Sequence, residues 1–228
     1  MPGLEPTGRR RPGGGRWWVS LLVAGAALAG SAVTAKHWPA AAISIPEPEL
    51  SAFPSGRALP LLRLGHAQLA ADLAWLRAIQ YYGRHRMEDQ SYPHARHLFD
   101  VITGLDPEFE DAYIFGALIL AEDVGRPQQA EELLTRGMAA MPQSWWLAFE
   151  RGFLRMLHRD DRERAAHDFL RASRIPGAPA WVARFAAWNY EKLGQAERAR
   201  RLWEQVARST QDPKVREIAA RALERLDA

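Results

Sequence analysis

The sequence of 228 residues contains no cysteine. This absence excludes disulfide bonds, thiolate metal sites, cysteine nucleophiles, lipoprotein anchoring through cysteine and c-type haem attachment. The remaining composition, with 47% hydrophobic and 25% charged residues, is that of a chain able to bury an ordinary core. We therefore predict a folded protein without covalent cross-links.

The sequence motifs of common enzymes and cofactor sites are also missing. There is no G-x-S-x-G elbow, no P-loop and no G-x-G-x-x-G, and the glycine run at residues 13–15 has no strand before it. No candidate nucleophile has a base beside it. The sequence thus predicts no enzyme activity, no catalytic residue and no cofactor, and it shows no small-molecule substrate site.

Two histidines leave one alternative open. His94 and His97 lie three residues apart on a predicted helix, a spacing at which two imidazoles can share a metal ion. The sequence fixes no third ligand and lacks the HExxH arrangement. We predict no metal site, and keep a metal-dependent enzyme or metal-binding protein using His94 and His97 as the alternative.

The basic charge of the chain is concentrated at its N-terminus. Residues 1–36 hold five basic residues and one acidic residue, a net of +4, and the whole chain carries +3, which leaves −1 for residues 37–228. A nearly neutral domain argues against nucleic acid as a partner. Nucleic-acid binding through the arginines of the C-terminal part remains a second alternative.

Residues 17–35 contain no charge and lie between Arg16 and Lys36. A helix of that length spans about 30 Å, which is the hydrocarbon thickness of a bilayer. The arginines that precede it orient the N-terminus towards the cytoplasm. We predict a transmembrane signal anchor here, with a signal peptide cleaved after Ala35 as the alternative. Both interpretations place the rest of the chain outside the cytoplasm, in a bacterial periplasm.

The flanking segments differ in composition. Residues 1–16 are rich in glycine, proline and arginine and are predicted to form a disordered, basic, cytoplasmic leader. Residues 36–61 contain five prolines and are predicted to form an extended linker. The third segment, residues 62–228, is predicted to fold as a domain of helical repeats.

A repeat of about 34 residues runs through this third segment. Small residues recur at spacings of 35, 35 and 34, at Ala95, Ala130, Ala165 and Ala199. Four residues after each comes a large apolar side chain, at Phe99, Leu134, Phe169 and Trp203. Seven after each comes a further apolar or small residue, at Ile102, Gly137, Ala172 and Val206. Spacings of four and seven put all three positions on one helix face.

Prolines and glycines divide each repeat into two helices. In the stretch from Asp106 to Pro142, Gly125 ends one helix and Pro127 begins the next. The same reasoning predicts a first helix over residues 62–84, a loop after it, and a helix that begins at Pro93. Further hairpins are predicted over 109–140, 144–174 and 179–209, and a last helix over 213–226.

A period near 34 residues made of helix–turn–helix is typical of the tetratricopeptide repeat (TPR), and the stretch from Leu62 to Pro213 resembles that family. The family's first-helix tryptophan and Leu-Gly pair are reduced here to Phe115-Gly116 and Arg151-Gly152. The resemblance implies an all-α fold: a TPR-like right-handed α-solenoid of about four helix-turn-helix repeats with a C-terminal capping helix. The uncharged stretch 17–35 adds an N-terminal transmembrane helix before it.

In this family the first helix of each pair lines a concave groove, where partners bind as extended peptides or helices. When the first helices of the repeats are aligned with one another, the resemblance implies a partner-binding groove. Its residues are Tyr113, Trp146, Phe149, Phe153, Trp181, Arg184 and Trp188. An apolar groove with tryptophan and arginine is a plausible surface of high binding energy. The alternative for each aromatic ring is core packing between repeats.

The function expected from this sequence is a non-enzymatic scaffold or adaptor of the bacterial cell envelope. It would bind a partner protein or peptide in the groove, with no nucleic acid. It would be a single-pass protein of the inner membrane, attached through residues 17–35, with its C-terminal domain in the periplasm. A role in assembling a pilus, secretion or export system follows only by analogy from the location and repeat class.

Overall fold

The structure, a computed structural model, describes residues 67–227, and every regular element within them is helical. The α-helices are α3 (Ala67–Met87), α4 (Ala95–Leu105), α5 (Glu110–Leu118), α6 (Pro127–Ala140), α7 (Trp145–His158), α8 (Arg162–Arg174), α9 (Ala183–Lys192), α10 (Ala196–Ser209) and α11 (Pro213–Asp227). A π-helix, η2 (Ile119–Asp123), follows α5, and a 3₁₀ turn, η3 (Ala180–Val182), precedes α9.

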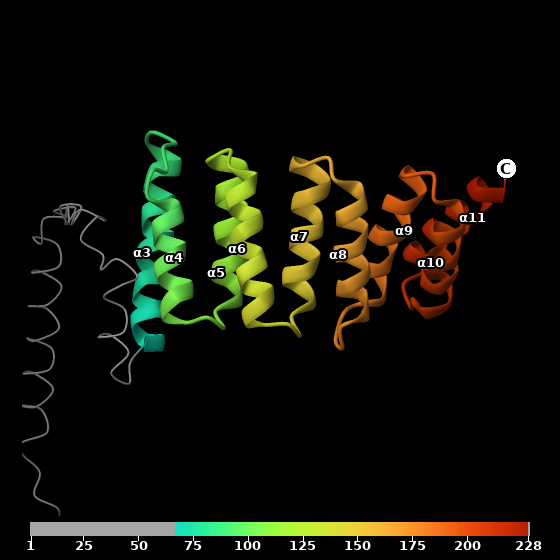
Figure 1. The fold of residues 1–228 in the computed structure, drawn as a ribbon, viewed down its shortest axis with the longest axis horizontal. Helices are drawn as coiled ribbons and strands as arrows, with labels where there is room; N and C mark the ends of the chain where they lie inside the picture. Colours follow the sequence, from blue (N-terminus) through green and yellow to red (C-terminus); the bar gives the residue numbers. More distant parts are fainter. Residues whose placement is uncertain (1–66, 228) are drawn as a thin grey trace, which may run out of the picture. The chain divides into compact units, whose positions relative to one another are not determined.

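Consecutive helices form hairpins that stand side by side in chain order (Figure 1). The pairs are α3 with α4, α5 with α6, α7 with α8, and α9 with α10, and α11 packs against α10. Each second helix also contacts the first helix of the next pair. Over residues 67–227 the predicted all-α solenoid of four hairpins and a terminal helix is therefore confirmed.

The repeated positions found in the sequence form the core of this stack. Side chains at the small, large and third positions of each repeat are all buried, from Ala95, Phe99 and Ile102 in α4 to Ala199, Trp203 and Val206 in α10. Small residues allow a close approach between helices. At Gly152 an added Cβ would lie 2.9 Å from the ring of Phe169, so this position of α7 has no room for a side chain. The spacing of four and seven correctly identifies the buried face.

Local chemistry explains most helix ends. Pro127 occupies the first turn of α6, where its missing N–H is not needed. The hydroxyl of Ser144 accepts the N–H of Leu147 at 3.1 Å, and the carboxylate of Asp161 accepts the N–H of Arg164 at 3.1 Å, which caps α7 and α8. Gly125, with φ of +68°, adopts the left-handed conformation between the two helices of its hairpin.

Two boundaries near α3 differ from the prediction. The helix continues to Met87 instead of ending at residue 84, because the N–H of Glu88 still bonds the carbonyl of Arg84 at 3.0 Å. The next helix begins at Ala95 and not at Pro93. The polar residues that the sequence assigns to a loop therefore form the exposed last turn of α3.

The first helix of the second hairpin ends in a π-helix. The N–H of Val124 bonds the carbonyl of Ile119 at 3.0 Å, the i to i+5 pattern that inserts one residue into a helix. This π-helix carries Ala121 and Glu122, which lie beside the space between α5 and α7.

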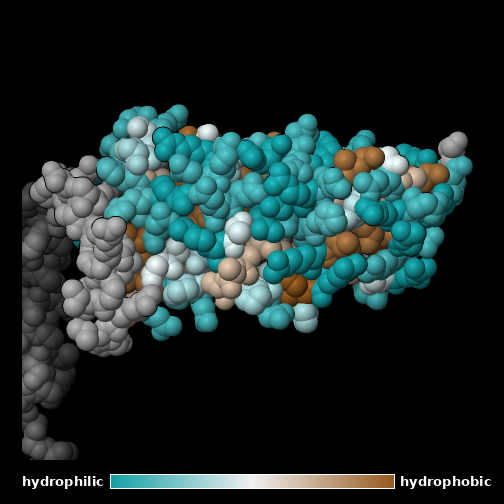
Figure 2. Space-filling model, in the orientation of Figure 1, coloured by the Kyte–Doolittle hydropathy of each residue, from teal (hydrophilic) through white to brown (hydrophobic). Residues whose placement is uncertain are grey.

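The two end helices of the described stack have different outer faces. Leu69, Leu73 and Leu76 of α3 are each more than half exposed. In α11, Val215, Ala219 and Ala222 are buried and the outer positions are mainly charged, as expected of a helix that ends a solenoid. The face in Figure 2 is mainly hydrophilic, with small separate hydrophobic patches.

The predictions for the leader (1–16), the transmembrane segment (17–35) and the linker (36–61) fall outside the described residues. Between residues 67 and 227, no helix has the length and apolarity needed to cross a membrane.

Candidate functional site

The first helices of neighbouring hairpins present equivalent residues at steps of about 35. In α7 the positions Trp146, Glu150, Phe153 and Leu157 follow one another at spacings of four, three and four, so they lie on one face. In α5 and η2 the matching face carries Ile114, Leu118 and Glu122. In the last hairpin it carries Trp181 of η3 and Trp188 and Lys192 of α9.

The structure separates the seven predicted groove residues by depth. Trp146 is 46% exposed, whereas Tyr113 and Phe149 are buried, at 3% and 8% exposed. The remaining four are half-buried: Phe153, Trp181, Arg184 and Trp188. A partner approaching this face would meet Trp146 and the half-buried residues, whereas Phe149 packs behind them against Trp181 and Phe185. Tyr113 packs elsewhere, against Gly137 of α6.

Aromatic rings fill the space between α7 and α9. The ring of Phe149 lies 5.4 Å from that of Trp181 and 5.2 Å from that of Phe185, and Phe153 lies 5.2 Å from Phe185. The guanidinium of Arg184 covers Phe185 at 4.9 Å. Such edge-to-face and cation–π contacts stabilise the stack of hairpins. This part of the surface is already occupied by the chain's own side chains.

Trp188 is also engaged within the protein. The guanidinium of Arg162 lies 5.1 Å from its ring centroid, and the ammonium of Lys192 lies 5.9 Å from it. The tryptophan is half-buried between these cations. Its indole therefore already contributes to the contact between α8 and α9.

The space between α5 and α7 is different, because a hollow of about 110 Å³ remains open there. We call it the α5–α7 hollow; its lining residues are Ile114, Ala117, Leu118, Ala121, Glu122, Leu134, Glu150, Phe153, Leu154, Leu157 and His158. Leu118 and Leu157 are 53% and 62% exposed at its edge. Most of the lining is apolar, so the hollow suits an apolar group that is excluded from water.

Glu150 is a half-buried carboxylate within this apolar lining. Burial raises its pKa, and the hydrogen bond from the Trp146 indole opposes that rise. The indole Nε1 donates to Oε1 of Glu150 at 2.9 Å. No lysine, arginine or histidine of the described chain pairs with this carboxylate.

A contact between a histidine and a glutamate lies at one end of the hollow. Nε2 of His158 lies 2.8 Å from Oε1 of Glu122, across the gap between α7 and η2. The π-helix η2 contains Glu122, and the side chain of Glu122 reaches His158 of α7. The histidine is therefore engaged with Glu122 and does not pair with Glu150.

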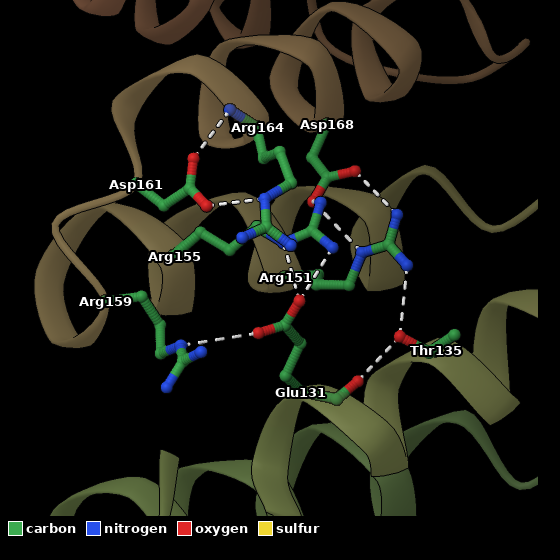
Figure 3. Close-up of polar contacts among 8 residues, drawn as sticks. All are labelled: Glu131, Thr135, Arg151, Arg155, Arg159, Asp161, Arg164 and Asp168. Carbon is green, nitrogen blue, oxygen red and sulfur yellow. Dashed lines mark hydrogen bonds and ion pairs between the residues drawn. The ribbon is translucent and has the colours of Figure 1, made fainter. Parts of the chain in front are cut away.

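The opposite side of α7 carries a compact cluster of charges (Figure 3). Arg151 binds both oxygens of Asp168 at 3.0 and 2.7 Å, and Arg155 reaches the same carboxylate at 2.7 Å. Arg155 also binds Glu131 at 2.7 Å, and Arg151 donates to the hydroxyl of Thr135 at 3.0 Å. The cluster joins α6, α7 and α8, so it fixes two successive hairpins relative to each other.

Sequence reasoning missed Glu150, Leu118 and Leu157 as candidates because it selected aromatic residues. The signal was present in the spacing, since Glu150 and Leu157 share the helix face of Trp146 and Phe153. A lone carboxylate within an otherwise apolar helix face marks a position that needs a partner.

The histidines of the metal alternative do not meet a third ligand. Over the described residues, no three histidine, aspartate or glutamate side chains are placed to hold one metal ion. His94 lies against the ring of Tyr81 at 6.4 Å.

Several arginines of the C-terminal part, which the nucleic-acid alternative would use, form internal ion pairs. Arg225 pairs with Glu191 at 3.1 Å, and Arg200 pairs with Asp227. Arg221 pairs with Glu217 one turn away. These pairs neutralise part of the basic charge that the alternative needs.

Comparison with known proteins identifies the fold. No protein-family model matches the sequence, and no curated protein matches it. Among solved structures, PilF of Pseudomonas aeruginosa is similar over 70% of this chain and 70% of its own, with 18% identity and a TM-score of 0.51.

Two further structures are similar at lower scores. TTC0263, a thermophilic TPR protein of Thermus thermophilus, is similar over 75% of this chain and 97% of its own, at 17% identity and a TM-score of 0.45. MamA is similar over 72% of this chain and 91% of its own, at 14% identity and a TM-score of 0.46.

The fold rests on the helix pairs themselves. Hairpins recur every 34 or 35 residues, with the same three positions buried in each second helix. Over residues 67–227, the chain is a TPR-like α-solenoid.

Proposed function

We propose that the chain is a non-enzymatic interaction scaffold that binds a partner protein or peptide at the α5–α7 hollow. The single observation that carries this proposal is the open apolar lining between two first helices, with Leu118 and Leu157 exposed at its edge. Exposed apolar side chains around a hollow mark a surface that gains free energy when a partner covers it.

The predicted groove residues take different roles in this proposal. Trp146 and Phe153 contact the partner directly, because one is exposed and the other lines the hollow. Trp181, Arg184 and Trp188 extend the surface towards α9. Tyr113 and Phe149 are buried and serve the packing of the helices, Tyr113 against Gly137 of α6 and Phe149 against Phe185 of α9.

We also propose that this scaffold works in a bacterial envelope. The support is the uncharged stretch 17–35 between Arg16 and Lys36, which has the length of a membrane anchor. On this view the repeat domain faces the periplasm and assembles a partner there, as in a pilus, secretion or export system.

Site-specific cross-linking tests the binding site. A photoreactive benzoyl-phenylalanine replaces Leu157 in the full chain, and a matched variant carries it at Ile218, an exposed residue of α11. After irradiation in cells, we expect a discrete protein adduct from position 157 and none from position 218. No adduct at 157, or the same adducts at both positions, would contradict a binding site at the hollow.

A further inference from the structure

The carboxylate of Glu150, which has no cationic partner in the described chain, indicates the chemistry of the partner that binds in the hollow. It lies on α7 beside Phe153, within the lining that Ile114 and Leu118 complete from α5. Its one hydrogen bond within the described chain comes from the Trp146 indole at 2.9 Å. The remaining acceptor capacity of an ionised carboxylate is therefore unused on this face.

The surrounding charges do not supply the missing partner. His158, at the end of the hollow, is paired with Glu122 at 2.8 Å. Arg151 and Arg155 project to the opposite side of α7 and are bound by Asp168. Both basic residues of α7 nearest to Glu150 in the chain are thus committed elsewhere, and the local charge of the hollow is negative.

A half-buried carboxylate without a cation is unfavourable in the free protein, because burial removes hydration without replacing it. A guanidinium or ammonium group brought by a ligand would form the charge-assisted hydrogen bonds that the chain itself does not provide. The hollow of about 110 Å³ beside it is large enough for one aliphatic side chain and too small for a folded element.

From this geometry we propose that the partner of the α5–α7 hollow is a peptide segment that inserts one aliphatic side chain and sets a neighbouring lysine or arginine against Glu150. This inference rests on the proposed function and adds the chemistry of the partner. The aliphatic group supplies buried area, and the cation selects partners by charge.

Selection from a random peptide library displayed on phage tests the inference with the full-length chain as bait. The selected peptides are synthesised, and their dissociation constants are measured for the wild type, Glu150→Gln, Leu157→Ala and Glu163→Gln. Glu163 is an exposed residue of α8, so its variant controls for the same change of acid to amide. Circular dichroism checks that each variant keeps its helix content.

We expect selected peptides to combine an aliphatic residue with a nearby lysine or arginine. Glu150→Gln should weaken their binding about tenfold or more, as loss of a hydrogen bond to a charged group does, while Glu163→Gln leaves it unchanged. Peptides that depend on Leu157 but bind Glu150→Gln as tightly as wild type would overturn this inference and leave the proposed function standing. Peptides that depend on neither residue would overturn both.

Discussion

Glu150 of α7 and Asp168 of α8 are two carboxylates in different surroundings, one in the α5–α7 hollow and the other in the charged cluster on the opposite side of α7. Asp168 is 3% exposed and receives hydrogen bonds from Arg151 and Arg155 at 2.7 to 3.0 Å. Glu150 has the Trp146 indole as its one partner within the described chain. The charge of Asp168 is balanced by two arginines of the protein, whereas the charge of Glu150 has no cation beside it in the described chain.

The difference distinguishes a structural charge from a binding charge. Asp168 of α8 accepts hydrogen bonds from Arg151 and Arg155 of α7, and these two arginines also donate to Thr135 and Glu131 of α6, so removing one group leaves the others buried and unpaired (Figure 3). Around Glu150 the neighbours are apolar and one side is open. The same chemical change at the two positions should therefore have opposite effects on stability.

The largest effect is expected for Asp168→Asn. The amide removes the negative charge that two guanidinium groups share, and breaking a buried ion pair on one side costs about 3 kcal/mol or more. For a chain of this size that corresponds to a fall in Tm of about 6–12 °C. Thermal unfolding followed by circular dichroism measures it.

The control for this prediction is Asp72→Asn on the exposed side of α3. It should change Tm by no more than about 1–2 °C, as exposed substitutions usually do. Equal losses in the two variants would mean that the cluster around Asp168 does not hold the hairpins together.

A smaller effect of opposite sign is expected for Glu150→Gln. Burial raises the pKa of Glu150 in the folded state. A raised pKa means that the stability from this group is fully present below the unfolded pKa and is lost as pH rises through the folded pKa. The amide does not ionise, so the variant should gain stability relative to wild type as pH rises from about 4 towards neutrality, by less than the loss expected for Asp168→Asn.

Urea unfolding at several pH values checks this sign. The difference between Glu150→Gln and wild type should grow towards neutral pH, with no such trend for Glu163→Gln. A variant that becomes less stable than wild type at neutral pH would show that the carboxylate has a stabilising partner within the chain.

The repeat itself could be predicted from the sequence because it depends on the spacing of residues within single helices. Positions four and seven residues apart must lie on one helix face, and the alanines at 95, 130, 165 and 199 had to face a neighbouring helix. All of them are buried. Prolines and glycines at the turns then placed most helix boundaries within a few residues.

The site was harder to predict from the sequence, because it depends on how the first helices of different hairpins pack against one another. Phe149 and Phe153 share a predicted face, yet one is buried and the other lines the hollow. Which ring fills a gap depends on side chains of the next hairpin, such as Trp181 and Phe185. The π-helix η2, which carries the Glu122 that contacts His158, also could not be predicted, because no single residue type marks a π-helix in a sequence.

The most direct test of this account is the pKa of Glu150, measured by ¹³C NMR of its side-chain carboxyl in the free chain and with a selected peptide bound. We expect a pKa above the ordinary glutamate value of about 4.3 in the free chain. We expect the pKa to fall clearly once a peptide's lysine or arginine pairs with the carboxylate. An ordinary pKa in the free chain, or a pKa that the bound peptide leaves unchanged, would contradict the claim that Glu150 is kept unpaired for a cationic partner.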